Sequence, residues 1–360
     1  MAAENDFRLD TVIEASHRMG RGVKTSLTST VKLRVGDLVE VRSKAEILAT
    51  LDSDGRLDVL PFMPEMLKYC GKRFRVYKRA DRTCDTIAYT GMRRMVDAVH
   101  LEGLRCDGSS HGNCEARCLL FWKEAWLKRV SAGPDASHVA VGSSPTACTE
   151  TRLLQTTRAI SSDESNHDEV FSCQATELVR ATTALSPWDF RQYLRDIRSG
   201  SITVTLALRA IFWRSFRATL SIRGYRLQLW LYNTFQRLRG GDPFPYLRGH
   251  LTKTPSFRLD LEPGAVVKVR KREEIAATLD TNCRNRGLFF DVEMTKYCGG
   301  TFKVLARVEH IINERSGRMM SLPNDCLILD GVVCQADHHW ACPRSIYPYW
   351  REIWLERVDP

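Results

Sequence analysis

The chain contains the same segment twice. Residues 36–130 align with residues 264–358 at a constant offset of 228 positions and without a gap, and 35 of the 95 aligned pairs are identical. Structural repeats in solenoid proteins recur about every 20–50 residues, so a period of this length indicates a duplicated domain. This duplication constrains the fold strongly, because both copies must build the same elements from the positions that they share.

Cysteine and histidine recur at matching places in the two copies. The chain has only 12 cysteines and 9 histidines in 360 residues, yet four such positions coincide. They are Cys70, Cys106, His111 and Cys114 in the first copy, and Cys298, Cys334, His339 and Cys342 in the second. Three thiolates and one imidazole form a tetrahedral ligand set that suits zinc. We therefore expect a structural zinc ion in each copy.

Other interpretations of these residues stay open. Cys118 offers a different fourth ligand in the first copy, but the second copy has Ile346 at that position. Cys70 and Cys298 can instead be core residues, because free cysteine is often buried as a small apolar side chain. A disulfide framework is disfavoured because the start of the sequence lacks the pattern of an export signal. We expect a cytoplasmic protein, in which thiols stay reduced.

Composition changes along the chain predict its organisation. A chain of 360 residues is expected to hold two or three domains, and the stretch between the copies is rich in serine and threonine before it becomes basic. The predicted parts are a flexible arm (1–30), a first β-rich repeat (31–132), a disordered linker (133–183), a basic helical insert (184–256) and a second β-rich repeat (257–360).

The insert carries most of the excess positive charge. Residues 187–256 contain 12 basic and 3 acidic side chains. Ser186 and Pro187 form a helix start, and Gly224 is expected to divide residues 201–239 into two helices. These helices carry no acidic residue and seven arginines, which we take as candidate partner-binding residues: Arg209, Arg214, Arg217, Arg223, Arg226, Arg237 and Arg239.

A basic amphipathic helix can dock on an acidic protein, bind nucleic-acid phosphates or lie on an anionic membrane. The insert is too rich in arginine to span a bilayer. We favour an acidic protein or nucleic acid over a membrane surface. The remaining alternative is that the apolar faces pack on the repeats and the arginines are only solvated.

The repeats themselves are expected to be mainly β. Two tryptophans four residues apart close each copy, Trp122 and Trp126 in the first and Trp350 and Trp354 in the second, and we expect them to be core residues. Short strands are predicted at 38–41 and 266–269, and a glycine precedes each strand. This opening resembles bacterial SH3-like and KOW-type small barrels, although the resemblance covers only residues 36–41 and 264–269. Each whole repeat also resembles conserved bacterial tandem-repeat proteins of unassigned function. The expected fold class is therefore α+β, with two duplicated SH3-like domains joined by a helical insert.

No common catalytic motif is present in the sequence: it has no phosphate-binding glycine loop, no nucleophile elbow and no H-E-x-x-H. Arginines kept in both copies predict buried ion pairs, with Glu46/Glu274 or Glu124/Glu352 as partners; the alternative is that they bind carboxylates or phosphates. They are Arg42/Arg270, Arg79/Arg307 and Arg129/Arg357. The expected function is a non-enzymatic, zinc-stapled adaptor. The alternative is a metal- or thiolate-dependent enzyme acting at the Cys/His loop, where Glu65 or Glu102 would stand beside a three-ligand site.

Overall fold

The structure is a computed structural model. It describes the chain with several gaps, and the expected arm at residues 1–30 lies outside the described part. The described residues are 32–87, 91–130, 148–159, 169–186, 189, 191–220, 225–238, 240 and 247–358, without the side chains of 159, 213–220, 225, 226 and 228.

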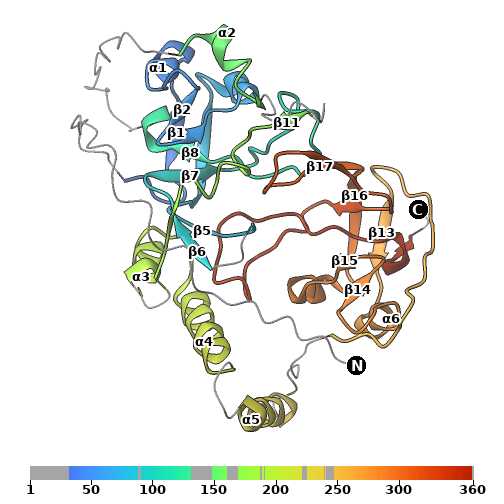
Figure 1. Ribbon diagram of the computed structural model, residues 1–360. Helices are drawn as coiled ribbons and strands as arrows, with labels where there is room; N and C mark the ends of the chain where they lie inside the picture. The colour runs from blue at the N-terminus through green and yellow to red at the C-terminus, as the bar shows by residue number, and fades with distance from the viewer. Residues whose placement is uncertain are drawn as a thin grey trace, which may run out of the picture. The chain divides into compact units, whose positions relative to one another are not determined.

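The two repeats build matching elements in the same order (Figure 1). The first repeat contains β1 (Leu38–Val41), α1 (Lys44–Leu48), β2 (Arg56–Leu57), β3 (Leu60–Pro61), η1 (Pro64–Tyr69), β4 (Arg73–Arg79), β5 (Arg82–Cys84), β6 (Met92–Arg94), β7 (Ala98–Leu101), β8 (Trp122–Lys123), η2 (Glu124–Trp126) and β9 (Leu127–Arg129). The second repeat contains β13 (Val266–Val269), α6 (Arg272–Ala276), β14 (Arg284–Asn285), β15 (Leu288–Phe289), η3 (Val292–Tyr297), β16 (Thr301–Arg307), β17 (His310–Ile312), β18 (Met319–Ser321), β19 (Leu327–Leu329), η4 (Glu352–Trp354) and β20 (Leu355–Arg357).

Each repeat is organised around one antiparallel sheet. The strand order is β8-β7-β4-β1-β9 in the first repeat and β19-β16-β13-β20 in the second. The pairing even breaks at the same place, because β4 shifts register on β7 between Val76 and Lys78, and β16 shifts on β19 between Val304 and Ala306. These positions differ by 228 residues. The mixed α+β class and the duplication are therefore confirmed.

Local sequence explains where the short helices begin and end. Ser43 caps α1, and the Glu46 carboxylate accepts a hydrogen bond from the Ser43 backbone N–H in a capping box. Gly71 and Gly299 follow η1 and η3 with φ of 73° and 80°, a conformation that costs glycine little. The chain then turns into β4 and β16, which places η1 and η3 beside the sheets.

The two cores use the same aromatic packing. Phe62 contacts Trp126 edge-to-face at 5.1 Å between ring centroids, and Phe290 contacts Trp354 at 5.2 Å. Both tryptophans are fully buried. The sequence-based interpretation of the paired tryptophans as core residues is thus confirmed.

In each repeat, a threonine two residues after the short helix, α1 or α6, accepts a hydrogen bond from one buried tryptophan. Trp126 Nε1 donates to Thr50 Oγ1 at 3.1 Å, and Trp354 Nε1 donates to Thr278 Oγ1 at 3.0 Å. Thr50→Val is expected to lower the free energy of unfolding by about 1–3 kcal/mol, because it leaves a buried donor unpaired. Urea unfolding checks this, and Thr278→Val is expected to show a similar loss. Unchanged midpoints in both variants would contradict this prediction.

The predicted buried ion pairs also form in both repeats. Arg79 pairs with Glu124, and Arg307 Nη1 lies 2.7 Å from Glu352 Oε1. Each arginine also donates to a backbone carbonyl at the entry of its repeat, at Leu33 and Leu261 respectively. The same contact therefore joins the entry segment of each repeat to the end of β4 or β16 and to η2 or η4.

The repeats contact each other reciprocally. The Cys84 N–H on β5 donates to Cys342 Sγ at 3.3 Å, and the Ile312 N–H on β17 donates to Cys114 Sγ at 3.4 Å. Equivalent residues also meet each other, since Arg315 donates to the carbonyl of residue 87, its counterpart, at 2.7 Å. Contacts of this type, in which i touches j and j touches i, define an isologous interface. The two repeats meet as the subunits of a two-fold homodimer do.

The stretch 133–183 was expected to be a disordered linker, and its described parts correct that expectation. They form short elements: α2 (Glu150–Leu153), β10 (Arg158–Ala159), β11 (Val170–Phe171) and β12 (Thr183–Ala184). Leu153 and Leu178 are buried in the first core. Gln174 is also buried, and its amide bonds both the N–H and the carbonyl of Phe121. A few well-placed apolar and polar side chains order a segment whose average composition is polar.

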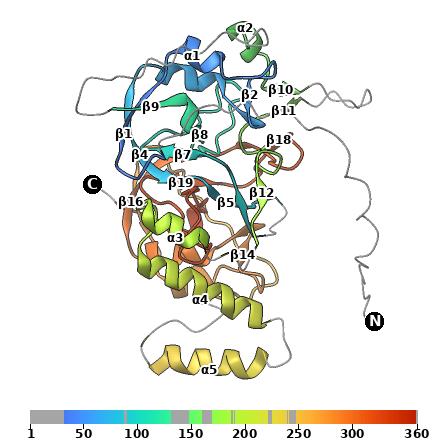
Figure 2. The same cartoon turned by 90° about the vertical axis from the view of Figure 1, so that its left-hand side faces the viewer.

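The insert contains three helices, as expected, but the first begins at Arg191 and not at the predicted start, Ser186 and Pro187. They are α3 (Arg191–Arg198), α4 (Val204–Leu220) and α5 (Tyr225–Leu238), which lie in succession in Figure 2. Gly224 lies outside the described residues. Residues 247–256 belong structurally to the second repeat, because Leu247 packs on its core and Leu251 pairs with Asp280. Within the described part of the chain, no helix has the length and apolar character needed to cross a membrane.

One buried histidine gives the fold a pH dependence. His100 on β7 is fully buried, and its Nδ1 lies 2.9 Å from the Leu120 carbonyl. Burial lowers the pKa of His100 from 6.5 to about 3. The unfolded chain therefore takes up a proton at a pH where the folded chain does not, so stability falls as pH drops from 6.5 towards 3.

Because of His100, we expect the free energy of unfolding to be about 2 kcal/mol lower at pH 5 than at pH 7. Urea unfolding at both pH values measures this loss. His100→Gln cannot take up the proton, so its pH-dependent loss is expected to be smaller than that of the wild type. Equal losses in the two proteins would show that His100 is not responsible.

Candidate metal centres

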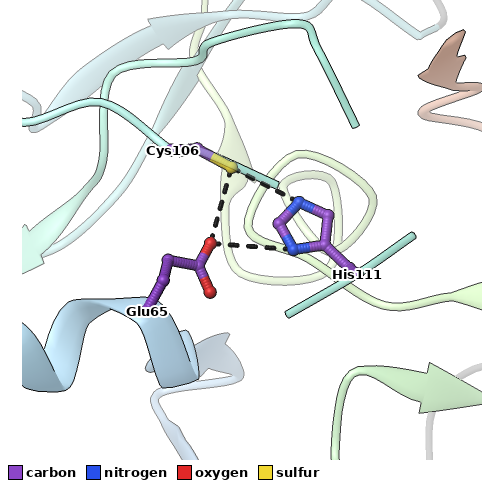
Figure 3. Close-up of side chains that lie close together, drawn as sticks. All are labelled: Glu65, Cys106 and His111. Carbon is purple, nitrogen blue, oxygen red and sulfur yellow. Dashed lines mark hydrogen bonds and ion pairs between the residues drawn. The ribbon is translucent and has the colours of Figure 1, made fainter. Parts of the chain in front are cut away.

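Three polar side chains meet in the first repeat (Figure 3). Cys106 Sγ lies 3.3 Å from His111 Nε2 and 3.5 Å from Glu65 Oε1. Glu65 Oε1 is also 3.6 Å from His111 Nδ1. A sulfur, an imidazole nitrogen and a carboxylate oxygen thus lie close enough together to share one metal ion.

Two separate segments bring these ligands together. Glu65 lies in the first turn of η1, whereas Cys106 and His111 lie on the loop after β7. Gly108 makes that loop tight: it has φ of 74°, its carbonyl accepts the His111 N–H at 3.0 Å, and a Cβ there would lie 2.3 Å from a backbone oxygen. A metal would therefore join η1 to a loop that is already folded.

The first cluster has unbalanced charge. The side chains of Glu65 and His111 are each only 1% exposed. Among the described residues, no lysine or arginine forms an ion pair with Glu65, and its hydrogen-bond donors are the Ser110 hydroxyl and the Cys106 thiol. Burial and the nearby Glu65 raise the pKa of Cys106, and burial lowers the pKa of His111. Since buried charge needs a partner, a divalent cation suits this group.

The same three residue types meet at the aligned positions of the second repeat: Glu293, Cys334 and His339. Cys334 Sγ lies 3.3 Å from His339 Nδ1, and His339 Nε2 lies 3.2 Å from Asp291 Oδ2. In metal sites, a carboxylate commonly holds the far nitrogen of a ligating histidine. Asp291 can hold His339 Nε2 in this way while Nδ1 faces Cys334.

The aligned histidines differ because their surroundings differ. Burial acts to lower the pKa of His339, but hydrogen bonds to Asp291 and Cys334 raise it to about 11. The first repeat has Met63 at the position of Asp291, so His111 lacks this carboxylate. Burial therefore favours the neutral form of His111, whereas the Asp291 carboxylate favours the protonated form of His339.

The two clusters also differ in access. The second lies in the wall of a cavity of ≈ 380 Å³, and the His339 side chain is 38% exposed. The cavity at the first cluster measures only ≈ 40 Å³, enough for a few water molecules. It is lined by Cys106 and His111, together with further thiols at Cys114, Cys118 and Cys173. The first cluster is enclosed, and the second is open to a small molecule.

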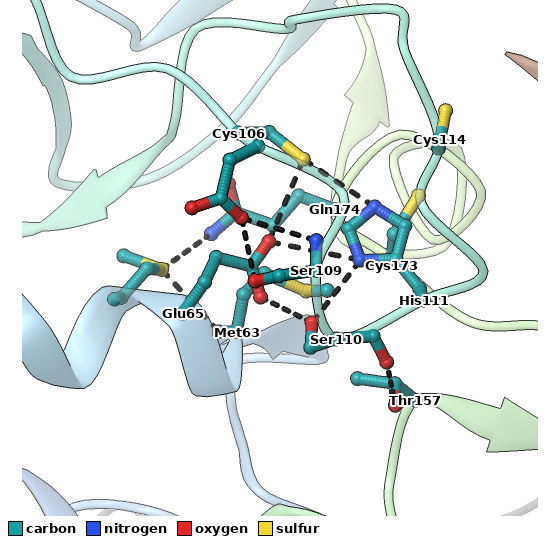
Figure 4. A network of polar contacts seen from close by, with 12 residues as sticks. Met63, Glu65, Cys106, Ser109, Ser110, His111, Cys114, Thr157, Cys173 and Gln174 are labelled. Atoms are coloured by element: carbon teal, nitrogen blue, oxygen red, sulfur yellow. Dashed lines mark hydrogen bonds and ion pairs between the residues drawn. The ribbon is translucent and has the colours of Figure 1, made fainter.

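The predicted zinc quartets are corrected by this geometry. Of the four predicted ligands in each copy, only the cysteine–histidine pairs Cys106–His111 and Cys334–His339 come together. Figure 4 shows Cys114 beyond the His111 ring, away from the cluster. In the described part of the chain, no group of three or more ligand residues with all ligand atoms within 4.8 Å contains any of the other predicted ligands: Cys70, Cys114, Cys118, Cys298 and Cys342.

The displaced cysteines have other roles. Cys70 and Cys298 are partly buried against the two cores, as the alternative interpretation proposed. Cys114 and Cys342 accept the backbone hydrogen bonds that join the repeats. Cys118 lines the small cavity, and burial raises its pKa to about 11.

Sequence reasoning assigned no ligand role to Glu65 and Glu293. Both are identical at aligned positions, five residues before the shared cysteines at 70 and 298. That identity was the available signal. Thiolate, imidazole and carboxylate are all zinc ligands, so the donor set of each cluster fits zinc with three protein ligands.

The predicted arginine surface is described only in part. Arg209 is half exposed, with its guanidinium 4.0 Å from Asp337, and Arg237 is exposed. The side chains of Arg214, Arg217 and Arg226 and the whole of Arg223 and Arg239 lie outside the described residues.

Comparison with known proteins gives no independent indication of function. No protein-family model matches the chain, and no curated protein matches it significantly.

Proposed function

We propose that the protein is an adaptor in which zinc ions stabilise the two repeats. Each repeat would hold one zinc ion through its Glu-Cys-His group, and the basic insert would dock on an acidic protein. The repeats themselves would be small barrels of the SH3-like type, built around the sheets that pair β1 with β9 and β13 with β20. The proposal rests mainly on one observation: the same three residue types meet at aligned positions in both repeats.

A structural role for the metal follows from the enclosure of the first cluster. A substrate cannot easily reach side chains that are 1% exposed beside a cavity of ≈ 40 Å³. A metal there would join η1 to the loop after β7, and it would offset the buried Glu65 carboxylate. Binding to the folded state alone stabilises that state.

Chelation of the full chain tests this structural role. We expect a zinc chelator to shift thermal unfolding, followed by tryptophan fluorescence, to lower temperature, and added zinc to restore the transition. Each core buries two tryptophans, Trp122 and Trp126 in the first and Trp350 and Trp354 in the second, so the fluorescence follows both repeats together. An unchanged transition after complete metal removal would overturn the proposal.

The docking role is supported by α5. Its side chains Leu227, Trp230 and Leu231 are 63%, 61% and 53% exposed, and they share one face at helical spacing. The opposite face is covered, since Tyr232 and Gln236 are buried. An exposed apolar face inside a segment with 12 basic and 3 acidic residues matches an acidic amphipathic helix.

A synthetic acidic amphipathic helix tests the docking surface. We expect binding that weakens as salt rises and that falls at least tenfold in Trp230→Ala, with Leu208→Ala on α4 as the control. Tighter binding to duplex DNA than to the peptide at the same ionic strength would instead identify a nucleic-acid surface. Partition onto phosphatidylserine vesicles without peptide binding would identify a membrane surface. Either outcome would overturn the acidic-protein assignment.

The open second cluster supports a second candidate, a metal-dependent enzyme of the hydrolytic class. Three protein ligands leave a fourth zinc position free, as in catalytic sites, and the ≈ 380 Å³ cavity gives a small molecule access to it. Cobalt substitution separates the candidates. If the second site is catalytic, thiocyanate is expected to change the cobalt spectrum of Cys106→Ser but not that of Cys334→Ser. No change in either variant would leave the adaptor as the only candidate.

A further inference from the structure

Two cysteines from different repeats face each other across the repeat interface. Cys84 lies at the end of β5, and Cys342 lies on the loop after His339. Their sulfur atoms are 2.9 Å apart, and the Cys84 N–H also donates to Cys342 Sγ. The chain has 12 cysteines, and the hydrogen bonds of the described residues join no other two sulfurs.

The chain holds this pair from both sides. Two residues before Cys84, Arg82 donates to the backbone carbonyls of Trp340 and Ala341, the latter at 3.1 Å. Two residues after Cys84, the Thr86 hydroxyl accepts a hydrogen bond from Arg344 at 2.8 Å. These hydrogen bonds hold the two segments together on either side of the sulfurs. A disulfide bond is about 2.05 Å long, so the two sulfurs, at 2.9 Å, lie within about 1 Å of bonding distance.

A small reagent can reach the sulfurs. Both cysteines line the cavity of ≈ 380 Å³, which also contains Arg344. Cys342 itself is only 4% exposed, so the cavity is the route by which a reagent meets the pair. Arg344, which also lines the cavity, forms an ion pair with Glu314 at 3.0 Å.

The first repeat provides an internal comparison. Cys114 aligns with Cys342 and accepts the equivalent backbone hydrogen bond, but its neighbour across the interface is Ile312 in place of Cys84. The backbone contact is therefore a feature of the repeat interface, and the second thiol is an addition at one of its two ends.

We propose that Cys84 and Cys342 form a peroxide-reactive dithiol that closes to a disulfide between the repeats. One sulfur attacks an oxygen of hydrogen peroxide, the O–O bond breaks, and a sulfenic acid and one water form. The second thiol attacks that sulfur, and the hydroxyl leaves as a second water. Two thiols are oxidised and one hydrogen peroxide is reduced, and the thiol protons end in the two waters.

Treating the full-length, metal-loaded protein with hydrogen peroxide tests this. After alkylation of free thiols, peptide mass mapping is expected to show a Cys84–Cys342 linkage, with two of the 12 thiols lost. Cys84→Ser and Cys342→Ser are each expected to abolish the linkage, and dithiothreitol is expected to reverse it in the wild type. Cys114→Ser, the matched control, is expected to retain it.

Three results would overturn the proposal: no linked peptide after oxidation, linkage of either cysteine to a different thiol, or irreversible oxidation of both without linkage. Metal content is measured in the same samples. Linkage with both metals retained keeps this reaction separate from oxidation of Cys106 or Cys334. Because the dithiol contains no residue of the two metal clusters, its failure would leave the adaptor proposal standing, and the reverse also holds.

Discussion

Glu65→Gln and His111→Ala are each expected to release one metal ion per chain and to destabilise the first repeat. The loss follows from mass action: a ligand present at 1,000 times its Kd stabilises the folded state by about 4 kcal/mol. His111→Ala also removes a buried ring, whereas Glu65→Gln keeps the volume and removes the carboxylate. Urea unfolding in the presence of a fixed free zinc concentration measures both effects.

Two controls make this prediction specific. Cys70→Ser and Cys114→Ser remove thiols that the sequence pattern assigned to the metal but that the structure places elsewhere. Both variants are expected to retain two metals per chain. If Cys70→Ser lost a metal while Glu65→Gln kept both, the predicted quartet would be right and the Glu-Cys-His group wrong.

The second large effect is the loss of stability expected when the buried Arg79–Glu124 ion pair of the first repeat is broken. The Arg79 and Glu124 side chains are 5% and 4% exposed. Glu124→Ala is expected to cost about 3–5 kcal/mol, because it leaves a charged guanidinium buried with only part of its compensation. Asp81 also bonds Arg79, at 2.6 Å, which keeps the loss towards the lower end.

A surface ion pair between the first repeat and α2 serves as the control. Lys44 Nζ lies 2.8 Å from Glu150 Oε1, but both side chains are almost half exposed. Lys44→Ala is expected to cost less than about 1 kcal/mol, because solvent and salt screen an exposed pair. Equal losses for Glu124→Ala and Lys44→Ala in urea unfolding would contradict the assigned role of burial.

The internal alignment predicted the fold in outline. It predicted the duplication, the strands at 38–41 and 266–269, the tryptophan cores and ion pairs between arginines and glutamates that both copies keep. These features follow from residues that both copies keep for the same local reason. The sequence could not show that the repeats meet through β5 and β17, because 84 and 312 are occupied by cysteine and isoleucine and share no visible pattern.

The metal site was predicted only in part because thiols have several uses. Cys106 and His111 are close in sequence, so a single loop can present both. The third ligand had to come from a distant segment, and Cys70 was chosen over Glu65 for its chemistry. The 3₁₀ geometry of η1 instead places the Glu65 side chain at the cluster and leaves Cys70 against the core.

The described parts of 133–183 were missed for a different reason. The stretch is polar on average, and its ordered parts depend on a few buried residues such as Leu153, Gln174 and Leu178. Gln174 is held by backbone groups of the first repeat, which no local pattern reveals. Tertiary contacts, and not propensity, order this segment.

The metal content of the purified full-length chain tests the central claim most directly. Elemental analysis after dialysis against metal-free buffer is expected to give two zinc ions per chain, one in Cys334→Ser, one in Cys106→Ser and none in the double variant. A wild-type chain that binds no zinc when refolded with an excess of it, or that keeps both ions in the double variant, would contradict the account.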